Sequence, residues 1–386
     1  MRILHVSTVS FADPHYYRSN EFVLCRSLAK LGHEVTLFTT NRPPRWQMLG
    51  SRETRSPIEV VDGFTIRRFH GGPEFYAISL TPALVRGILN SECDIIHAHH
   101  MLSPASFYSA IASGAERTPL ILTEHDYIYG GTHATKMLLH IAVYSTLGRF
   151  AVHRAKAVIA LSTAGAKLVQ RFGATPEKTR IIPSSVDTSV FRPRQRNLLE
   201  EKWGIGGSVV LFVGRLTADK DPGTLLRAFQ RVEADVPDAE LVMVGIGPDE
   251  QRLRNLVREL KLNRIFFLGR VPQSQMRFIY PGAKVLALPS LYEPFGNAAV
   301  EAMASGIPVV GTRIGGLADT IVHGETGYHI EPGNVKQLSR YLSELLMDEK
   351  LRRKMSRVAR EIAVERFDDM AIVRTVERLY REALNR

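Results

Sequence analysis

The sequence is poor in cysteine, since its 386 residues contain only Cys25 and Cys93. Two cysteines in a chain of this length do not form a disulfide framework, and their spacing matches no metal cluster. The chain also has no run of about 18 apolar residues, the length that a membrane-spanning helix requires. These absences disfavour a disulfide-rich secreted domain and an integral membrane protein, and they fit a reducing compartment.

The first ten residues, MRILHVSTVS, contain one arginine and a short apolar run that His5 interrupts. A secretory signal peptide needs a longer apolar stretch, so we expect a cytoplasmic protein. The formal net charge of +11 favours anionic partners such as nucleotide sugars or phospholipid surfaces. No nucleic-acid-binding motif is present, and the basic residues are spread over both halves. A solvated basic surface therefore ranks first, peripheral contact with the cytoplasmic face of a membrane second, and no nucleic-acid partner is expected.

The length and a hydrophobic share of 45% indicate two domains, each with an ordinary core. An apolar strand at 3–6, an amphipathic helix at 21–31 and a second strand at 33–39 form a strand-helix-strand unit. A second set of alternating strands and helices begins at 209–214. This pattern predicts an α/β protein with two parallel sheets, which bind ligands at the carboxyl ends of their strands.

The most informative stretch is SLYEPFGNAAVEAMASGIPVVG, at 290–311. A strand ends just before it, a turn with proline and glycine follows, and residues 297–305 favour a helix. The start of such a helix offers free N–H groups and the positive end of the helix dipole, which favour an anion such as a pyrophosphate. Glu293 and Glu301 bracket the turn, so both carboxylates are placed to reach one ligand.

The setting of these two glutamates, LYEPFGNAAVEAMASGIPVV, resembles the signature of the retaining glycosyltransferases of family 4. The resemblance covers nearly the whole chain and is more specific in the second half. It implies the GT-B architecture, in which two Rossmann-like domains face each other across a cleft and the last helix crosses back to the first domain. We expect an acceptor-side domain over 1–190, a nucleotide-sugar-binding domain over 191–365 and the returning helix over 366–386.

The resemblance also implies donor-binding residues in the second half. Arg215 and Lys220, in the segment GRLTADKD after a strand, are expected to neutralise the leaving diphosphate. Glu293 is expected to hold hydroxyls of the donor sugar, and Glu301 the two ribose hydroxyls. The other expected donor contacts are Gly245 in a glycine turn, Arg270 and Val271 beside the base, and Phe295, Gly296 and Asn297 at the helix start.

In the first half, polar residues stand where predicted strands end. His99 and His100 close the segment DIIHAHH and are expected to contact an acceptor. We expect no metal at these histidines, because no carboxylate or thiol with ligand spacing follows them. His125 follows the strand LILTE, and the resemblance places this imidazole against the donor sugar as a catalytic residue.

One loop departs from the family pattern. The family usually has a Gly-Gly turn after the first strand, whereas this chain has FADPHYYRS at 11–19. Without glycine the backbone cannot approach a phosphate as closely, so a side chain, Arg18 or His15, is expected to make the anion contact. The basic segment 41–57 around Trp46 is interpreted as a solvated loop, with acceptor or membrane contact as the alternative.

These features predict a metal-independent, retaining hexosyltransferase that needs no cofactor. The donor is a nucleoside-diphosphate sugar, with uridine or guanosine favoured, and the acceptor is a carbohydrate, lipid-linked or small-molecule hydroxyl. The main alternative is a non-catalytic nucleotide-sugar-binding subunit of a glycosyltransferase complex, which the altered loop at 11–19 leaves open. A nicotinamide dehydrogenase is disfavoured, because no acidic residue clearly ends the second strand of a glycine-fingerprint unit.

Overall fold

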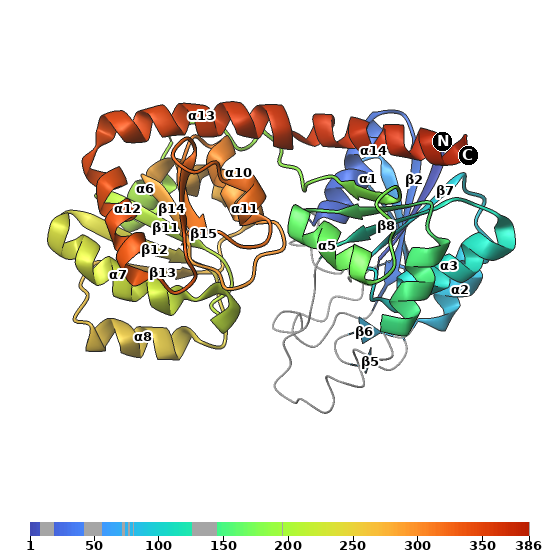
Figure 1. Ribbon diagram of the computed structural model, residues 1–386, viewed down its shortest axis with the longest axis horizontal. Coiled ribbons are helices and arrows are strands. Elements are labelled where there is room, and N and C mark those ends of the chain that lie inside the picture. The colour runs from blue at the N-terminus through green and yellow to red at the C-terminus, as the bar shows by residue number, and fades with distance from the viewer. Residues whose placement is uncertain are drawn as a thin grey trace. The chain divides into compact units, whose positions relative to one another are not determined.

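A computed structural model of the chain describes residues 1–7, 19–41, 56–71, 74–75, 78–79, 81–125, 145–194 and 196–385. The chain divides into two compact units, Met1–Pro183 with Asp369–Arg386, and Ser184–Asp368. Each unit is built on a sheet flanked by helices, as Figure 1 shows, and the strands of both sheets pair mostly in parallel. Arg18, His15 and Trp46 from the sequence analysis lie outside the described residues, as does most of the loop at 11–19.

The first unit contains an eight-stranded sheet with the order β10-β9-β8-β7-β1-β2-β4-β3. All neighbouring strands in it pair in parallel except β3 and β4. Its strands are β1 (Arg2–Val6), β2 (Glu34–Thr40), β3 (Ile58–Val61), β4 (Phe64–Phe69), β7 (Ile95–His99), β8 (Leu120–Glu124), β9 (Ala157–Ala160) and β10 (Thr179–Ile181), and a separate short pair is β5 (Glu74–Phe75) and β6 (Ile78–Ser79). Its helices are α1 (Asn20–Lys30), α2 (Pro82–Leu89), α3 (Pro104–Glu116), α5 (Thr163–Arg171) and α14 (Asp369–Leu384), with a further helical stretch at 145–154.

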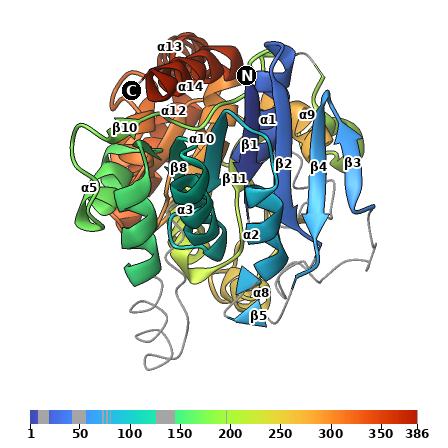
Figure 2. The same ribbon diagram turned by 90° about the vertical axis from the view of Figure 1, so that its right-hand side faces the viewer.

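Helices cover both faces of this sheet, so its central strands are apolar on both sides. Ile3, Ile95 and Ile121 pack with the helices α1 and α14. Leu4 and Ile96 point the opposite way and pack with α2 and α3, which Figure 2 shows in front of the strands. Successive residues of a strand point to opposite faces, which explains this division.

The last helix, α14, belongs to the first unit, as the sequence analysis expected. Its apolar residues Val373 and Val376 join the same core as α1. The Arg26 guanidinium donates to the Asp369 carboxylate at 3.2 Å, and Tyr380 is fully buried with its hydroxyl 2.5 Å from His97 Nδ1. The C-terminal helix is therefore an integral part of the first unit.

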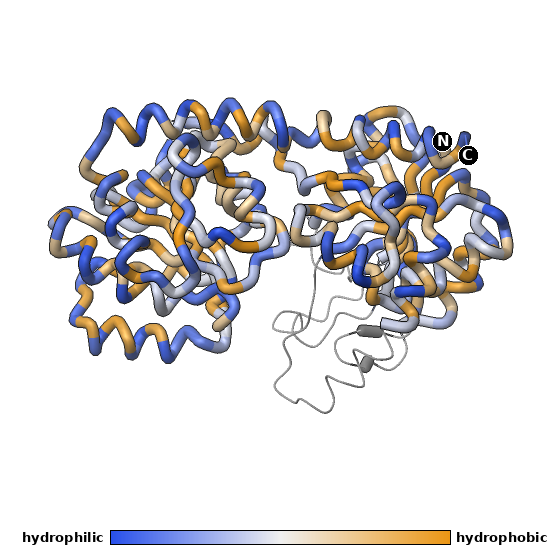
Figure 3. Tube along the Cα trace, in the orientation of Figure 1, coloured by the Kyte–Doolittle hydropathy of each residue, from blue (hydrophilic) through white to orange (hydrophobic). Residues whose placement is uncertain are grey.

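The second unit contains a six-stranded, all-parallel sheet with the order β13-β12-β11-β14-β15-β16. Its strands are β11 (Ser208–Val213), β12 (Ala239–Val244), β13 (Ile265–Gly269), β14 (Val285–Leu288), β15 (Val309–Thr312) and β16 (Gly327–Ile330). Its helices are α6 (Leu198–Trp203), η3 (Ala218–Lys220), α7 (Pro222–Asp235), α8 (Glu250–Glu259), α9 (Gln273–Ile279), η4 (Tyr280–Gly282), α10 (Asn297–Ala304), α11 (Leu317–Thr320), α12 (Val335–Met347) and α13 (Glu349–Phe367). Figure 3 shows apolar residues gathered along these strands, whereas α8 alternates between apolar and polar residues.

In each sheet the strand order reverses beside the first strand of the unit, β1 or β11. In the second unit the chain builds outward from β11 through β12 to β13, and then returns to the other side of β11 with β14. In the first unit, β1 lies between β2 and β7 in the same way. Loops diverge on opposite faces at such a reversal, and the carboxyl ends of the two strands there form the usual ligand site.

None of the helices in the described part of the chain combines the length and the hydrophobicity that crossing a bilayer requires.

Burial of Tyr380 provides a test of how much α14 stabilises the first unit. We expect Tyr380→Ala to lower the free energy of unfolding by about 3–5 kcal/mol, because it removes a large buried ring. Urea denaturation followed by circular dichroism measures this change. Leu384→Ala, on the same helix but 41% exposed, is the control and should change it by less than about 0.5 kcal/mol. Similar losses for the two variants would contradict this role of Tyr380.

Candidate functional site

The residues predicted from the sequence fall into two groups, one in each unit. In the second unit, an ion pair joins the two loops at the strand reversal. Lys220 Nζ donates to Glu293 Oε2 at 2.9 Å and to the Tyr292 carbonyl at 3.1 Å. Ser290 Oγ also donates to Glu293 Oε2, at 3.3 Å. The Lys220 and Glu293 side chains are only 13% and 15% exposed, so the pair is screened less than a surface salt bridge.

Backbone hydrogen bonds reinforce this connection between the loops. The Asp219 carbonyl accepts hydrogen bonds from the N–H groups of Leu291 and Tyr292, at 2.8 and 3.2 Å. Arg215 Nη2 donates to the Asp219 carboxylate at 3.1 Å. The segment after β11 and the turn after β14 are thus held together by both backbone and side chains.

Glycines allow the backbones at this edge to approach closely. Gly296 precedes α10 with φ at +97°, a left-handed conformation that favours glycine. At Gly315 and Gly316 an added Cβ would overlap the backbone of Glu293 and of Phe295. At Gly245 it would overlap the carbonyl of Gly214. The glycines therefore fix the shape of the turn that carries Glu293 and begins α10.

The N-terminus of α10 lies directly after this turn. Phe295 and Gly296 are buried, whereas Asn297 is exposed at the first helical position. No side chain caps the helix start among the described residues. The first N–H groups of a helix carry partial positive charge, so this end is suited to a phosphate oxygen.

Glu301 is held by two residues that the sequence analysis did not single out. Gln273 Nε2 donates to Glu301 Oε1 at 2.5 Å, and the Tyr280 hydroxyl donates to Oε2 at 2.8 Å. Burial and the nearby carboxylate raise the pKa of Tyr280 well above its usual value, so its hydroxyl stays protonated and remains a donor. These contacts fix the orientation of the carboxylate. Arg270 and Val271 follow β13 on the same edge of the sheet, and Arg270 is exposed.

In the first unit, a group of histidines lies where β1, β7 and β8 end. His5 on β1 is the register partner of His97 on β7, and His99 follows two residues later on the same face. The rings of His97 and His99 stack with centroids 4.5 Å apart. His5 Nδ1 lies 2.9 Å from His99 Nε2, and His99 Nδ1 lies 3.1 Å from His125 Nε2. Three imidazoles are thus linked in series.

Burial keeps most of these rings neutral. It lowers the pKa of His5 to about 3 and that of His125 to about 4, and it lowers the pKa of His97 and His99 well below the ordinary value. His97 has partners at both nitrogens, Tyr380 at Nδ1 and the Thr123 hydroxyl at Nε2.

Glu21 provides the negative charge next to this group. It is 3% exposed, and His100 Nε2 lies 3.2 Å from its Oε1. Burial alone would raise the pKa of Glu21, but the neighbouring imidazoles of His125 and His100 outweigh it and hold this pKa below its usual value. Burial likewise opposes the charge on His100, yet the hydrogen bond with Glu21 raises the pKa of His100. Glu21 and His100 therefore form a buried ion pair.

Within the described part of the chain, two sets of side chains have the spacing of metal ligands: His5, His97 and His99, and Glu21, His99 and His125. In each set the ligand atoms lie within 4.8 Å of one another. Both nitrogens of His97 and of His99 already have hydrogen-bonding partners, so a metal would have to displace those bonds.

The structure thus brings Arg215, Lys220, Glu293 and the start of α10 to one edge of the second sheet, and His99, His100 and His125 to one edge of the first. Sequence reasoning missed Glu21, His5, Gln273 and Tyr280. A signal existed for His5, because a polar residue interrupts an otherwise apolar strand.

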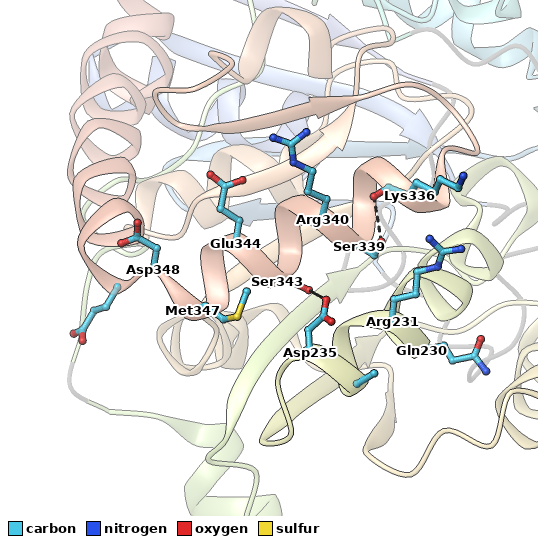
Figure 4. Close-up of a pocket in the computed structure, with 12 residues that line it drawn as sticks. Gln230, Arg231, Asp235, Lys336, Ser339, Arg340, Ser343, Glu344, Met347 and Asp348 are labelled. Carbon is cyan, nitrogen blue, oxygen red and sulfur yellow. Dashed lines mark hydrogen bonds between the residues drawn. The ribbon is translucent and has the colours of Figure 1, made fainter.

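A separate hollow of about 1190 Å³ lies between α7 and α12 (Figure 4). Ser343 Oγ donates to Asp235 Oδ2 across it at 2.9 Å, and Arg231 and Arg340 line it. It lies beside the C-terminal half of α7, whereas the strand-end loops adjoin the start of that helix. None of the predicted site residues that the structure describes lines this hollow, so we do not assign the reaction to it.

The chain is similar to known proteins in sequence and in fold. Residues 22–190 match the family model Glycosyltransferase Family 4, and residues 195–362 match Glycosyl transferases group 1. The chain is 28% identical to N-acetyl-alpha-D-glucosaminyl L-malate synthase of Bacillus anthracis, over 94% of this chain and 92% of that protein. It is 30% identical to D-inositol 3-phosphate glycosyltransferase of Acidothermus cellulolyticus, over 94% and 84%. The crystal structure of Anabaena HepE in complex with UDP and glucose matches the fold with a TM-score of 0.77 and 22% identity, over 98% and 99% of the two chains.

The buried histidines predict a specific loss of stability in mild acid. Unfolded imidazoles take up protons below about pH 6.5, whereas folded His5 and His125, with pKa values of about 3 and about 4, do not. The unfolded state then binds more protons, so the free energy of unfolding falls as the pH drops through this window.

We expect His5→Phe to reduce this slope by about 1.4 kcal/mol per pH unit, because one such group is removed. Urea denaturation between about pH 6.5 and pH 4.5 measures the slope. His153→Phe replaces an exposed histidine of the same unit and serves as the control. Equal slopes for the two variants would show that His5 does not titrate as its burial requires.

Proposed function

The chain belongs to glycosyltransferase family 4, and we propose that it transfers a hexose, with retention of anomeric configuration, from a nucleoside-diphosphate sugar to a hydroxyl acceptor. Membership makes it a glycosyltransferase with a nucleotide-sugar donor. One observation supports the finer proposal. The Lys220 ammonium and the Glu293 carboxylate lie 2.9 Å apart, next to the start of α10, as a diphosphate subsite beside a sugar subsite would require.

Stabilisation of the leaving group is the first requirement of this reaction. As the glycosidic C–O bond breaks, negative charge develops on the nucleoside diphosphate. Lys220, Arg215 and the N–H groups at the start of α10 supply positive charge where that leaving group would lie. Asp219 orients the Arg215 guanidinium, which offers several N–H donors to a diphosphate. The protein thereby supplies charge neutralisation without a metal ion.

Glu293 is assigned to the hydroxyls of the transferred sugar. An ionised carboxylate accepts hydrogen bonds only, so it suits a hydroxyl-rich ligand. Its ion pair with Lys220 couples the sugar subsite to the phosphate subsite, because one ammonium group serves both. A shift of either group would therefore disturb both parts of the donor.

Glu301 is assigned to the ribose hydroxyls of the nucleotide. Gln273 and Tyr280 each donate to one of its oxygens, and a carboxylate oxygen can accept more than one hydrogen bond. Arg270 and Val271 are assigned to the base. Retention follows if the acceptor hydroxyl attacks the face from which the diphosphate leaves and gives its proton to the departing phosphate oxygen.

The first unit is assigned to the acceptor and to one side of the donor sugar. In this assignment His125 contacts the donor sugar, while His99 and His100 lie toward the acceptor. The curated relatives carry malate and inositol 3-phosphate in their names. Small anionic molecules with a hydroxyl group are therefore the first acceptors to test. UDP-sugars are the first donors, since HepE was crystallised with UDP and glucose.

A calorimetric titration with UDP, GDP and ADP in the presence of EDTA tests the donor site directly. We expect one of the three to bind without metal, because Lys220, Arg215 and α10 supply the positive charge. Lys220→Ala should weaken that binding by about tenfold to a hundredfold, the effect of losing one charge-assisted hydrogen bond. Arg353→Ala is the control, since Arg353 is a highly exposed cation of the same unit.

Binding without product formation from any sugar of the bound nucleotide would favour the non-catalytic subunit instead. No binding by any of the three would refute the proposed donor site.

The assignment of Glu301 makes a separate prediction. Glu301→Ala should raise the donor Michaelis constant by about tenfold to a hundredfold, because two ribose hydroxyls lose a charged acceptor. Glu344→Ala is a matched control, because Glu344 also accepts from a tyrosine hydroxyl, that of Tyr328 at 2.9 Å, but on α12. Steady-state kinetics with varied donor measures both. An unchanged Michaelis constant in Glu301→Ala would remove this residue from the ribose site.

A further inference from the structure

The three linked imidazoles of the first unit form a row that runs from His125 through His99 to His5. His125 Nε2 lies 3.1 Å from His99 Nδ1, and His99 Nε2 lies 2.9 Å from His5 Nδ1. All three residues are buried: the exposed fraction is 7% for His125, 1% for His99 and 0% for His5. Both nitrogens of the middle ring are used, so neither end is independent of the other.

Each N···N contact must contain one proton. Burial lowers the pKa of all three rings, so each is neutral near pH 7 and carries one N–H. A neutral imidazole donates from one nitrogen and accepts at the other. If His125 donates from Nε2, His99 must accept at Nδ1 and donate from Nε2 to His5. The opposite direction requires every ring to carry its proton on Nδ1. The three tautomers are therefore coupled.

The His5 end does not decide between the two directions. His5 Nε2 is buried and has no hydrogen-bonding partner among the described residues. One direction leaves an unpaired N–H there and the other an unpaired lone pair. An unsatisfied buried polar group costs about 1–3 kcal/mol in either case.

The other end is asymmetric because of Glu21. Its Oε1 lies 4.0 Å from His125 Nε2. A carboxylate attracts an N–H that faces it and repels a nitrogen lone pair. Glu21 itself is fixed by His100 at 3.2 Å, so its charge stays close to His125. The carboxylate therefore favours the direction in which His125 donates from Nε2.

We propose that His5 and His99 are positioning residues that hold His125 in the tautomer protonated on Nε2, with Nδ1 left to accept a hydrogen bond from a hydroxyl of the donor sugar. The sugar contact depends on the proposed function, but the tautomer does not. A free histidine exchanges between two tautomers, whereas a coupled row of three changes only if all three protons move together. The buried row thus fixes which nitrogen of the His125 ring donates a hydrogen bond and which nitrogen accepts one.

His97 provides a matched comparison inside the same stack. Its ring packs against His5 and His99, with centroids 4.9 and 4.5 Å away. Its nitrogens, however, bond to Tyr380 and Thr123, so it takes no part in the row. A change at His97 disturbs the packing and the contacts with Tyr380 and Thr123 but leaves the row intact, whereas the same change at His99 breaks the row.

The test is the tautomeric state of His125, read from the ¹⁵N chemical shifts of its two ring nitrogens in the full-length protein. The ring is assigned by comparison with His125→Asn. We expect the wild type to show a protonated Nε2 and an unprotonated Nδ1. His99→Phe should produce a mixture of the two tautomers, and His97→Phe should leave the wild-type pattern. His5→Phe should also produce a mixture, which gives a second variant if His99→Phe does not fold.

Three results would overturn the proposal. They are a wild-type His125 protonated on Nδ1, an unaltered His125 tautomer in both His99→Phe and His5→Phe, and stoichiometric zinc in the purified protein, since a metal would replace the shared protons. If the enzyme is active, kcat/KM for the donor should fall about tenfold in His99→Phe and less than twofold in His97→Phe. Absence of any transfer in the wild type would refute the proposed function and leave the tautomer test intact.

Discussion

The ion pair between Lys220 and Glu293 holds together the loops that begin at two neighbouring strands. The hydrogen bond from Lys220 to the Tyr292 carbonyl and the two hydrogen bonds to the Asp219 carbonyl add to this link between the segment after β11 and the turn after β14. The position of Glu293 fixes the conformation of the turn, and the turn determines where α10 begins. The arrangement of cations, carboxylate and helix start therefore has at its centre a charged contact that is mostly shielded from water.

The two units stabilise polar groups at their strand ends by different means. The second unit packs backbone against backbone, which is possible because glycine occupies the points of contact, such as Gly245 and Gly315. The first unit instead extends its apolar face with imidazoles, so that Ile3 is followed by His5 and Ile95 by His97 and His99. Imidazole suits this position because it packs as a flat ring and still satisfies a polar partner on either edge.

Sequence reasoning succeeded where the signal is local. Alternating strands and helices, and the turn and helix at 290–311, are encoded by periodicity and by proline and glycine within a few residues. It missed contacts between distant residues, such as Gln273 and Tyr280 with Glu301, which are 28 and 21 residues apart, or Glu21 with His100, which are 79 apart. Such pairs depend on strand order and helix rotation, which no short window of sequence contains. Many residues share the types of Gln273 and Tyr280, so composition alone could not select them.

The place of Tyr380 beneath β7 has a consequence for biosynthesis. Because α14 supplies Val373, Val376 and Tyr380 to the core of the first unit, that core lacks part of its surface until α14 has been synthesised. The second unit, Ser184–Asp368, has all of its residues earlier. Domains usually complete folding in the order in which they are translated. In this protein we instead expect Met1–Pro183, although it is translated before the second unit, to complete its folding after that unit.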